Sequence, residues 1–245
     1  MILAGCQKCS FVDYPGHLAA VAFTPGCNMN CFYCHNPELL SGPGPQRLDE
    51  AEMLDFLASR AGLLDAVVVS GGEPTLQHDL PDFIARVRRL GFAVKLDTNG
   101  TNPTMLRQLI SARLVDYVAM DIKASVRKYE QVTRTPVDNE AIEESILTLL
   151  AGQVDYEFRT TVAPPLRAAD ICQIASRIAG ARRYTLQQYR PDEALASAAI
   201  PHTDAYLRST ARLIQPFVDE VIVRGAGESA VQARLDSETR LANSA

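Results

Sequence analysis

The segment LAAVAFTPGCNMNCFYC (residues 18–34) joins a short apolar run to a loop that contains three cysteines. The run at 18–23 has the length and composition of a buried strand. Pro25 and Gly26 end this strand, and the cysteines follow at once. A strand that leads into a polar, ligand-rich loop is typical of α/β proteins, so the segments that follow decide which α/β fold this is.

Further apolar, β-branched segments follow at 66–70, 92–97, 115–122, 156–162, 184–189 and 220–224. Segments with helical spacing lie between them, and one of these places four apolar residues on a single helical face: Leu80, Phe83, Ile84 and Val87. Strict alternation of strands and helices predicts parallel strands joined by right-handed crossovers, either in a barrel or in an open doubly wound sheet.

Polar or glycine-rich residues follow almost every predicted strand, in the segments TPGCN, SGGEP, DTNG, DIK, TTVAPP and QYRP. In a barrel such ends converge on one face, where the active site lies, whereas in a doubly wound sheet they converge only at a switch point. Six such clusters favour a barrel, but about six strand–helix units are too few for a complete eight-stranded barrel. We therefore predict a partial (β/α)6-type, TIM-like barrel in one domain over residues 1–225, with a C-terminal tail at 226–245.

Composition argues against several classes of protein. A formal net charge of −5 with no basic run argues against nonspecific nucleic-acid binding. The N-terminal segment lacks a basic stretch followed by an apolar core, and no segment approaches the roughly 18 apolar residues needed to span a bilayer. We expect a cytoplasmic protein without nucleic-acid or membrane partners, whose six cysteines are ligands, catalysts or core residues rather than disulfides.

The triplet Cys27, Cys31 and Cys34 predicts an iron–sulfur site better than a zinc site. Structural zinc prefers four ligands in two close pairs, and no second Cys or His pair follows at suitable spacing. A [4Fe-4S] cluster takes one ligand per iron, so three thiolates leave one iron open for an exogenous ligand. Buried structural thiols are the simpler alternative, but the glycine turn and the polar His35 and Asn36 are not typical of a core.

The spacing Cys-x3-Cys-x2-Cys, with Tyr33 before the last cysteine, resembles the signature of the radical S-adenosylmethionine (SAM) enzymes. Within that superfamily, SFVDYPGHLAAVAFTPGCNMNCFYCHNPEL, VVSGGEPTLQ, KLDTNG, DYVAMDIKA and FRTTV resemble, in order and spacing, the activating proteins of anaerobic ribonucleoside-triphosphate reductase. These proteins belong to the glycyl-radical-enzyme activases. The resemblance runs from about Ser10 to Val162 and implies the radical SAM fold.

The same resemblance implies a reaction. Cys27, Cys31 and Cys34 would hold a [4Fe-4S] cluster whose open iron binds the amine and carboxylate of SAM. Reductive cleavage of SAM would yield a 5′-deoxyadenosyl radical, which takes a hydrogen atom from the Cα of a glycine in the partner reductase. Flavodoxin or ferredoxin is the implied electron donor. A partial barrel would leave a lateral opening through which the partner's glycine loop enters.

Two further segments suit other groups of SAM. Gly71 and Gly72 let backbone approach a ligand closely, and the neighbouring Glu73 can receive the SAM ammonium, a role that the resemblance assigns to this segment. In isolation the segment would equally suit an ordinary turn. The resemblance also implies that Tyr33 packs on the adenine, whereas simple loop packing is the alternative.

Charged residues end the next two strands. Asp97, Thr98 and Asn99 end the third strand, and Asp121 and Lys123 lie at the end of the fourth. Two carboxylates and a lysine at neighbouring strand ends suit a ligand that carries a carboxylate, with Lys123 as its partner. The resemblance implies that the two aspartates help hold a monovalent cation near that carboxylate. Otherwise they would be solvated loop charges.

Arg159 precedes the end of the fifth strand. Alternation places Arg159 and Thr161 on one side, and the sequence leaves open whether this side faces the lumen, where the arginine could pair with SAM or Asp121, or faces outward. Residues 187–189 end the sixth strand, where such activases can carry a histidine near the ribose. No histidine stands there, which leaves the adenosine contacts of this strand unassigned.

Two other functions stay open. A radical SAM enzyme that acts on a small molecule is the nearer alternative, because the motifs define SAM cleavage better than the hydrogen donor. A non-enzymatic zinc-binding module is the more distant one. Cys6 and Cys9 form a second pair that is incidental, a redox pair or half of an intermolecular metal site, and we favour the first interpretation. Cys172 lies in a helical pattern and is expected to pack as a small hydrophobe.

Overall fold

The computed structural model describes residues 1–40, 42, 47–191 and 199–226, so the predicted tail lies outside the described residues from 227 onward. The strands are β1 (Ile2–Leu3), β2 (Gly5–Ser10), β3 (Ala19–Thr24), β4 (Leu48–Asp49), β5 (Ala66–Gly71), β6 (Ala93–Thr98), β7 (Tyr117–Asp121), β8 (Asp155–Val162), β9 (Arg183–Gln188) and β10 (Glu220–Arg224). The α-helices are α1 (Glu50–Ala58), α2 (Leu80–Arg89), α3 (Pro103–Ser111), α4 (Tyr129–Thr133), α5 (Asn139–Leu150), α6 (Ala168–Arg177) and α7 (Asp204–Ile214).

One eight-stranded sheet, in the order β10-β9-β8-β7-β6-β5-β3-β2, organises the described residues. Neighbouring strands are parallel except for β2, which pairs antiparallel with β3. The predicted α/β class is therefore confirmed, and every predicted strand segment belongs to this sheet. The last predicted segment, 220–224, forms β10 at one edge of the sheet. The edge strands β2 and β10 do not pair with each other within the described residues, so the sheet is open.

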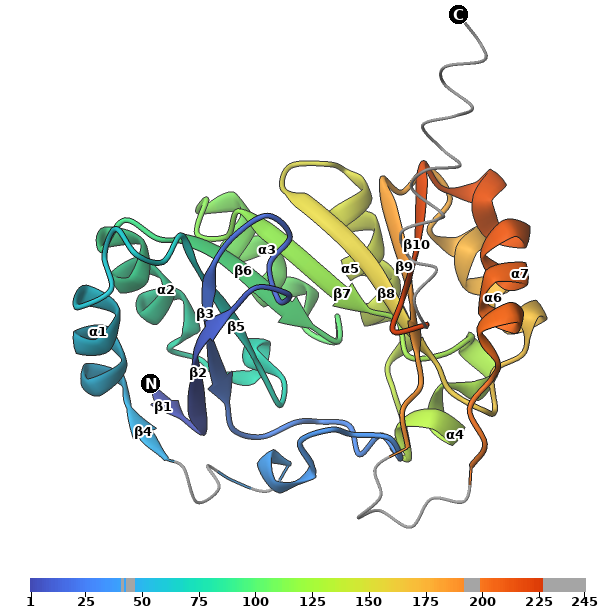
Figure 1. Cartoon of the computed structure of the whole chain (residues 1–245), viewed down its shortest axis with the longest axis horizontal. Coiled ribbons are helices and arrows are strands. Elements are labelled where there is room, and N and C mark those ends of the chain that lie inside the picture. The colour runs from blue at the N-terminus through green and yellow to red at the C-terminus, as the bar shows by residue number, and fades with distance from the viewer. Residues whose placement is uncertain (41, 43–46, 192–198, 227–245) are drawn as a thin grey trace, which may run out of the picture.

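The helices cover the outer side of this curved sheet (Figure 1). Alternate side chains of each strand point outward, where they meet the apolar stripes of the helices in one large core. On α2 the buried residues are those that the helical spacing predicts: Leu80, Phe83, Ile84 and Val87. The other side chains of each strand face inward, so the inner side of the sheet is free to hold polar groups at the carboxyl ends.

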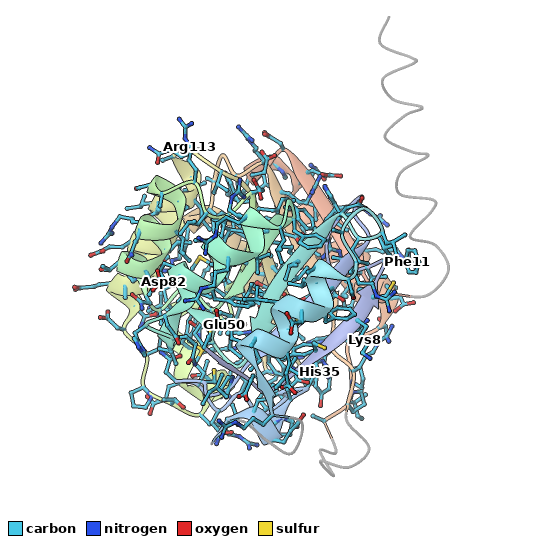
Figure 2. All side chains as sticks on the ribbon, turned by 90° about the vertical axis from the view of Figure 1, so that its left-hand side faces the viewer. Lys8, Phe11, His35, Glu50, Asp82 and Arg113 are labelled. Atoms are coloured by element: carbon cyan, nitrogen blue, oxygen red, sulfur yellow. The ribbon has the colours of Figure 1, made fainter. Side chains whose placement is uncertain are left out.

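The loop between β2 and β3 packs on the inner side of the sheet, at the amino ends of the strands. Tyr14 is buried there with Val21 and Val68, and its ring centroid lies 5.6 Å from that of Tyr117. Phe11, in the same loop, is 80% exposed and lies at the periphery of the molecule (Figure 2). Tyr14 therefore fills one end of the concave face, and the carboxyl ends of the strands remain available for a site.

Among the described residues, none of the helices combines the length and the apolar character that crossing a membrane would need.

Candidate functional site

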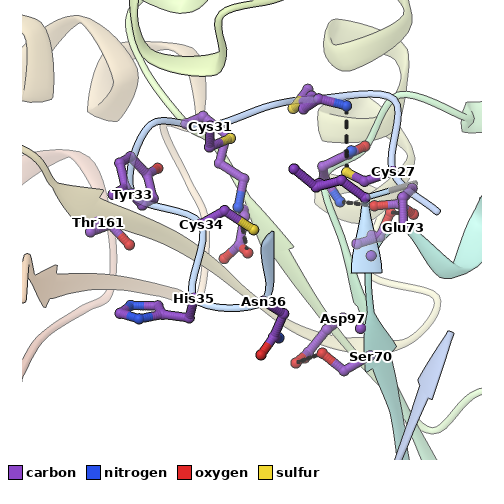
Figure 3. A pocket seen from close by; sticks show the side chains of 18 of the residues that line it. Cys27, Cys31, Tyr33, Cys34, His35, Asn36, Ser70, Glu73, Asp97 and Thr161 are labelled. Carbon is purple, nitrogen blue, oxygen red and sulfur yellow. Dashed lines mark hydrogen bonds and ion pairs between the residues drawn. The ribbon is translucent and has the colours of Figure 1, made fainter. Parts of the chain in front are cut away.

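A pocket of about 260 Å3 lies at the carboxyl ends of the parallel strands. All the site residues that the sequence predicts line this one pocket: Cys27, Cys31, Tyr33, Cys34, Gly71, Gly72, Glu73, Asp97, Thr98, Asn99, Asp121, Lys123 and Arg159. Figure 3 shows Cys27 beside Glu73 at one side of the view, Thr161 beside Tyr33 at the other, and Cys31 and Cys34 between them. Strand ends far apart in the sequence thus meet at a single place, as parallel strands require.

The cysteine loop begins where β3 ends at Thr24. Gly26 adopts a φ of +80°, a left-handed conformation that favours glycine, and its N–H donates to Leu39 O at 2.7 Å. Farther along, the N–H groups of Asn30 and Phe32 donate to the carbonyls of Thr133 and Val132 at the end of α4, at 2.9 and 3.3 Å. The protein's own backbone therefore holds the loop in place.

The thiols of this loop fit a cluster better than a single ion. Within the part of the chain that the structure describes, no three His, Cys, Asp or Glu side chains are grouped so that they could hold one metal ion. A [4Fe-4S] cluster binds each thiolate at a different iron, so its ligands need not converge on one point. Burial raises the pKa of the Cys27 thiol to about 11 and also raises that of Cys31. Metal binding at these two residues must therefore displace protons.

The two glycines at the end of β5 admit the protein's own loop. A Cβ atom at Gly72 would lie 1.9 Å from Gly26 O, and one at Gly71 would lie 2.3 Å from Thr24 N. Gly72 N and Glu73 N donate to Thr24 O and Gly26 O at 2.9 and 2.8 Å. The sequence predicts close approach here, and the structure shows that the approaching backbone is the start of the cysteine loop.

Glu73 links the end of β5 to the end of β6. Its Oε1 accepts bonds from Thr75 N, Thr75 Oγ1 and Thr98 Oγ1 at 3.1, 2.5 and 2.7 Å. Its Oε2 accepts one bond, from Asn99 N at 2.6 Å. Because a carboxylate oxygen has two lone pairs, Oε2 retains acceptor capacity for a ligand.

Five charged side chains form a buried network on the inner side of β6, β7 and β8. Arg159 lies 2.8 Å from Asp121 Oδ1 and 3.3 Å from Asp97 Oδ1, and Lys123 lies 3.0 Å from Asp121 Oδ2. Of the two orientations left open by the sequence, Arg159 takes the inward one. Lys95, beneath the pocket, pairs with Asp97 Oδ1 at 3.1 Å.

This network sets the ionisation of its carboxyls. Burial acts to raise the pKa of both Asp97 and Asp121, but nearby positive charge outweighs this effect. Arg159 and Lys95 lower the pKa of Asp97, and Arg159 and Lys123 lower that of Asp121. Both pKa values therefore lie below the ordinary range. Burial acts to lower the pKa of Lys123, yet Asp121 raises it well above normal. The pocket wall thus presents fixed charges of both signs, which suits a zwitterionic ligand.

Tyr33 is buried, and its hydroxyl makes no hydrogen bond with the residues that the structure describes. Its ring meets Phe32 edge-on, at 5.1 Å between centroids, and approaches Tyr189 at 6.3 Å. Burial raises the pKa of Tyr33 well above that of a free tyrosine. Tyr33 therefore lines the pocket as a neutral side chain, with its unpartnered hydroxyl oxygen buried.

The pocket also contains residues that the sequence does not single out as ligands: Met29, His35, Asn36, Leu40, Ser70, Thr161 and Gln187. Ser70 donates to Asp97 Oδ2 at 3.1 Å, and its position at the end of β5 could have predicted it. Of the other cysteines, Cys6 and Cys172 pack against the core as partly buried side chains, whereas Cys9 is exposed on β2. None of these three lines the pocket.

Comparisons with known proteins agree with this geometry. The profile of the radical SAM superfamily matches residues 21–178. A candidate glycyl-radical enzyme activating enzyme of Methanocaldococcus jannaschii is 36% identical over 235 residues, which cover 91% of this chain and 95% of that protein. A pyruvate formate-lyase-activating enzyme of Clostridium pasteurianum is 31% identical over 122 residues, 48% of this chain and 50% of that protein.

Solved structures show the same fold at low sequence identity. Streptococcus suis SuiB bound to S-adenosylmethionine superposes with a TM-score of 0.66 at 11% identity, over 84% of this chain and 52% of SuiB. A domain of a pyruvate-formate lyase-activating enzyme from Bacteroides vulgatus gives a TM-score of 0.54 at 17% identity, over 66% of this chain and 99% of that domain. At such identity the likeness concerns the fold alone.

Proposed function

The chain belongs to the radical SAM superfamily, and from that premise we propose that it activates a glycyl-radical enzyme, specifically an anaerobic ribonucleoside-triphosphate reductase. It is a radical SAM enzyme whose cofactors are a [4Fe-4S] cluster and SAM. When both are bound and an electron is supplied, they provide a 5′-deoxyadenosyl radical that can take a hydrogen atom from a glycine Cα. The protein's own task is to bind, orient and shield.

In this proposal Cys27, Cys31 and Cys34 hold the cluster and leave one iron open to SAM. Glu73 Oε2 accepts an N–H of the SAM amino group, since this oxygen accepts one hydrogen bond from the protein while Oε1 accepts three. The backbone at Gly71 and Gly72 brings this acceptor beside the cysteine loop.

The charged network serves the opposite end of the amino acid part of SAM. Lys123 pairs with the SAM carboxylate while it keeps its bond to Asp121. Asp97 and Asp121, both with lowered pKa values, offer anionic oxygens to a monovalent cation beside that carboxylate. Thr98 and Asn99 complete this wall, and Tyr33 packs on the adenine.

One observation favours an activase over a radical SAM enzyme that acts on a small-molecule substrate. The match to the candidate activating enzyme of Methanocaldococcus jannaschii extends over 91% of this chain and 95% of that protein. A protein of Pyrococcus abyssi described as a probable GTP 3′,8-cyclase matches 50% of this chain and 40% of its own length. A partial match of that kind supports shared SAM chemistry rather than a shared substrate.

The finer assignments rest on the motifs and on the open sheet. The segments from SFVDYPG to FRTTV resemble the reductase-activating class in order and spacing, which favours the reductase as partner. An open sheet leaves a lateral approach for a polypeptide loop. We propose flavodoxin or ferredoxin as the electron donor and the cytoplasm as the location.

The decisive experiment is an anaerobic assay of iron-reconstituted protein with SAM and dithionite, with and without a purified anaerobic ribonucleoside-triphosphate reductase. We expect 5′-deoxyadenosine by chromatography and a glycyl radical on the reductase by electron paramagnetic resonance (EPR) spectroscopy. The Cys31→Ala variant should give neither product. Cleavage of SAM without a glycyl radical would refute the activase assignment and favour a small-molecule substrate. Zinc near one equivalent, with negligible iron after anaerobic preparation, would refute the enzyme assignment itself.

A further inference from the structure

Three side chains form a closed ring of hydrogen bonds beside the cysteine loop. Asn28, which directly follows Cys27, donates from Nδ2 to Thr101 Oγ1 at 2.8 Å. Thr101 Oγ1 donates to Asn99 Oδ1 at 2.7 Å, and Asn99 Nδ2 donates back to Asn28 Oδ1 at 2.9 Å. The ring thus joins the cysteine loop to the segment that follows β6.

Asn99 has little side-chain capacity left for SAM. Its Oδ1 accepts a second bond, from Thr101 N at 3.0 Å, and its side chain is almost fully buried. Its backbone N–H meets Glu73 Oε2 at 2.6 Å. An unbroken path of hydrogen bonds therefore runs from Glu73 through Asn99 to Asn28, which adjoins the first cysteine.

This path connects the two places that SAM must reach at once. In the proposed function, the amino group of SAM would bind the open iron through its nitrogen lone pair and donate an N–H to Glu73, so the separation between Glu73 and the cysteine loop must match the ligand. Reacting groups held in advance at the right separation need no further ordering when the ligand binds. The opposite side of the loop is already fixed to the end of α4 through Asn30 and Phe32.

We propose that Asn28, Asn99 and Thr101 are positioning residues that preset the distance between the cluster and Glu73, the acceptor for the SAM amino group. The ring acts through the cysteine loop, and Asn99 contributes to SAM binding indirectly. This inference rests on the proposed placement of the cluster and SAM, but it does not depend on which molecule donates the hydrogen atom.

The first test uses protein without iron. Thr101→Val keeps the shape of the side chain and removes the hydroxyl that closes the ring, whereas Thr101→Ser keeps the hydroxyl. We expect amide hydrogen exchange over residues 27–32 to be about fivefold faster in Thr101→Val, which loses the two hydrogen bonds of the hydroxyl with Asn28 and Asn99, each at the low end of the usual net contribution. Exchange should be close to wild type in Thr101→Ser. Thr148→Val, on the exposed face of α5, controls for the loss of a hydroxyl elsewhere. Equal exchange in Thr101→Val and wild type would overturn the proposal.

The second test uses iron-reconstituted protein. SAM should bind about fivefold more weakly to Thr101→Val and to Asn28→Ala than to wild type, and the change that SAM causes in the EPR spectrum of the reduced cluster should be smaller. Thr101→Ser should restore both. Faster exchange with unchanged SAM affinity would refute the role in spacing. Because neither test includes a partner reductase, failure of the proposed activase function would leave these results intact.

Discussion

Arg159 Nε donates a 2.8 Å hydrogen bond to Oδ1 of Asp121, across the register in which β7 and β8 pair these two residues. The same guanidinium lies 3.3 Å from Asp97 on β6. A single buried cation therefore joins three neighbouring strand ends and keeps two carboxylates ionised close together.

Removal of this cation should leave buried negative charge poorly compensated. We expect Arg159→Met to lower the free energy of unfolding by about 3 kcal/mol, because breaking a buried pair on one side strands its partner. Lys95 and Lys123 remain and limit the loss. Arg159→Lys should recover part of it, and urea unfolding measures both variants. An Arg159→Met variant as stable as wild type would show that the two lysines suffice.

The depressed pKa of Asp121 makes stability depend on pH in acid. A carboxyl whose folded pKa lies below its unfolded value stabilises the fold above the unfolded pKa, and that contribution is lost as pH falls through the folded pKa. We expect the unfolding free energy of wild type to fall below about pH 4, and to fall less steeply in Asp121→Asn. Urea titrations from about pH 6 to pH 2 test this, and parallel profiles would contradict it.

The three loop cysteines should differ from the other cysteines in iron binding. Cys27→Ala, Cys31→Ala and Cys34→Ala should each lose most of the reconstituted iron, since each removes one of three ligands. The double variant Cys6→Ala/Cys9→Ala should keep wild-type iron and sulfide. Colorimetric iron and sulfide analysis measures both. Loss of iron in the double variant would show that this pair is not incidental.

Gly72 should tolerate no side chain, because a Cβ atom would lie 1.9 Å from Gly26 O. We expect Gly72→Ala to cost about 3 kcal/mol of unfolding free energy and to impair iron uptake, since the cysteine loop must move. Gly91 offers a matched control. Its φ is +92° but a Cβ there meets open space, so Gly91→Ala should cost only about 1 kcal/mol. Equal costs would mean that the loop can shift freely.

The Tyr33 hydroxyl makes no hydrogen bond with the described residues, whereas its ring is packed. Tyr33→Phe removes a buried hydroxyl without a partner and should therefore raise the unfolding free energy of iron-free protein by about 1 kcal/mol. If the ring packs on the adenine, Tyr33→Ala should weaken SAM binding about tenfold and Tyr33→Phe much less. Equilibrium dialysis with labelled SAM distinguishes them. Equal weakening would assign the contact to the hydroxyl.

The sequence predicts the parallel strands and the pocket lining well, because both depend on local signals. Each strand is a short β-branched run, and the site residues lie in the last residues of such a run or in the loop that follows it. The strand at 5–10 is not foreseen. β2 lies at an edge with three consecutive exposed residues at its centre, so its pairing with β3 rather than an apolar pattern defines it.

Properties that depend on contacts between distant segments could not be predicted. Alternation puts Arg159 and Thr161 on one side, but only the register with Asp121 and the curvature of the sheet decide that this side faces inward. The anchoring of the cysteine loop by Thr133, and by the pairing of Asn28 with Thr101, joins residues about 70 to 100 positions apart. Such contacts leave no periodic pattern in the sequence from which they could be predicted.

Because β2 and β10 do not pair within the described residues, the sheet does not close around the site. Reactive intermediates must be shielded from water, and the described strands do not form a closed barrel that would do this alone. If a partner polypeptide donates the hydrogen atom, as we propose, its glycine loop would also cover this edge, and two molecules together would then enclose the reaction.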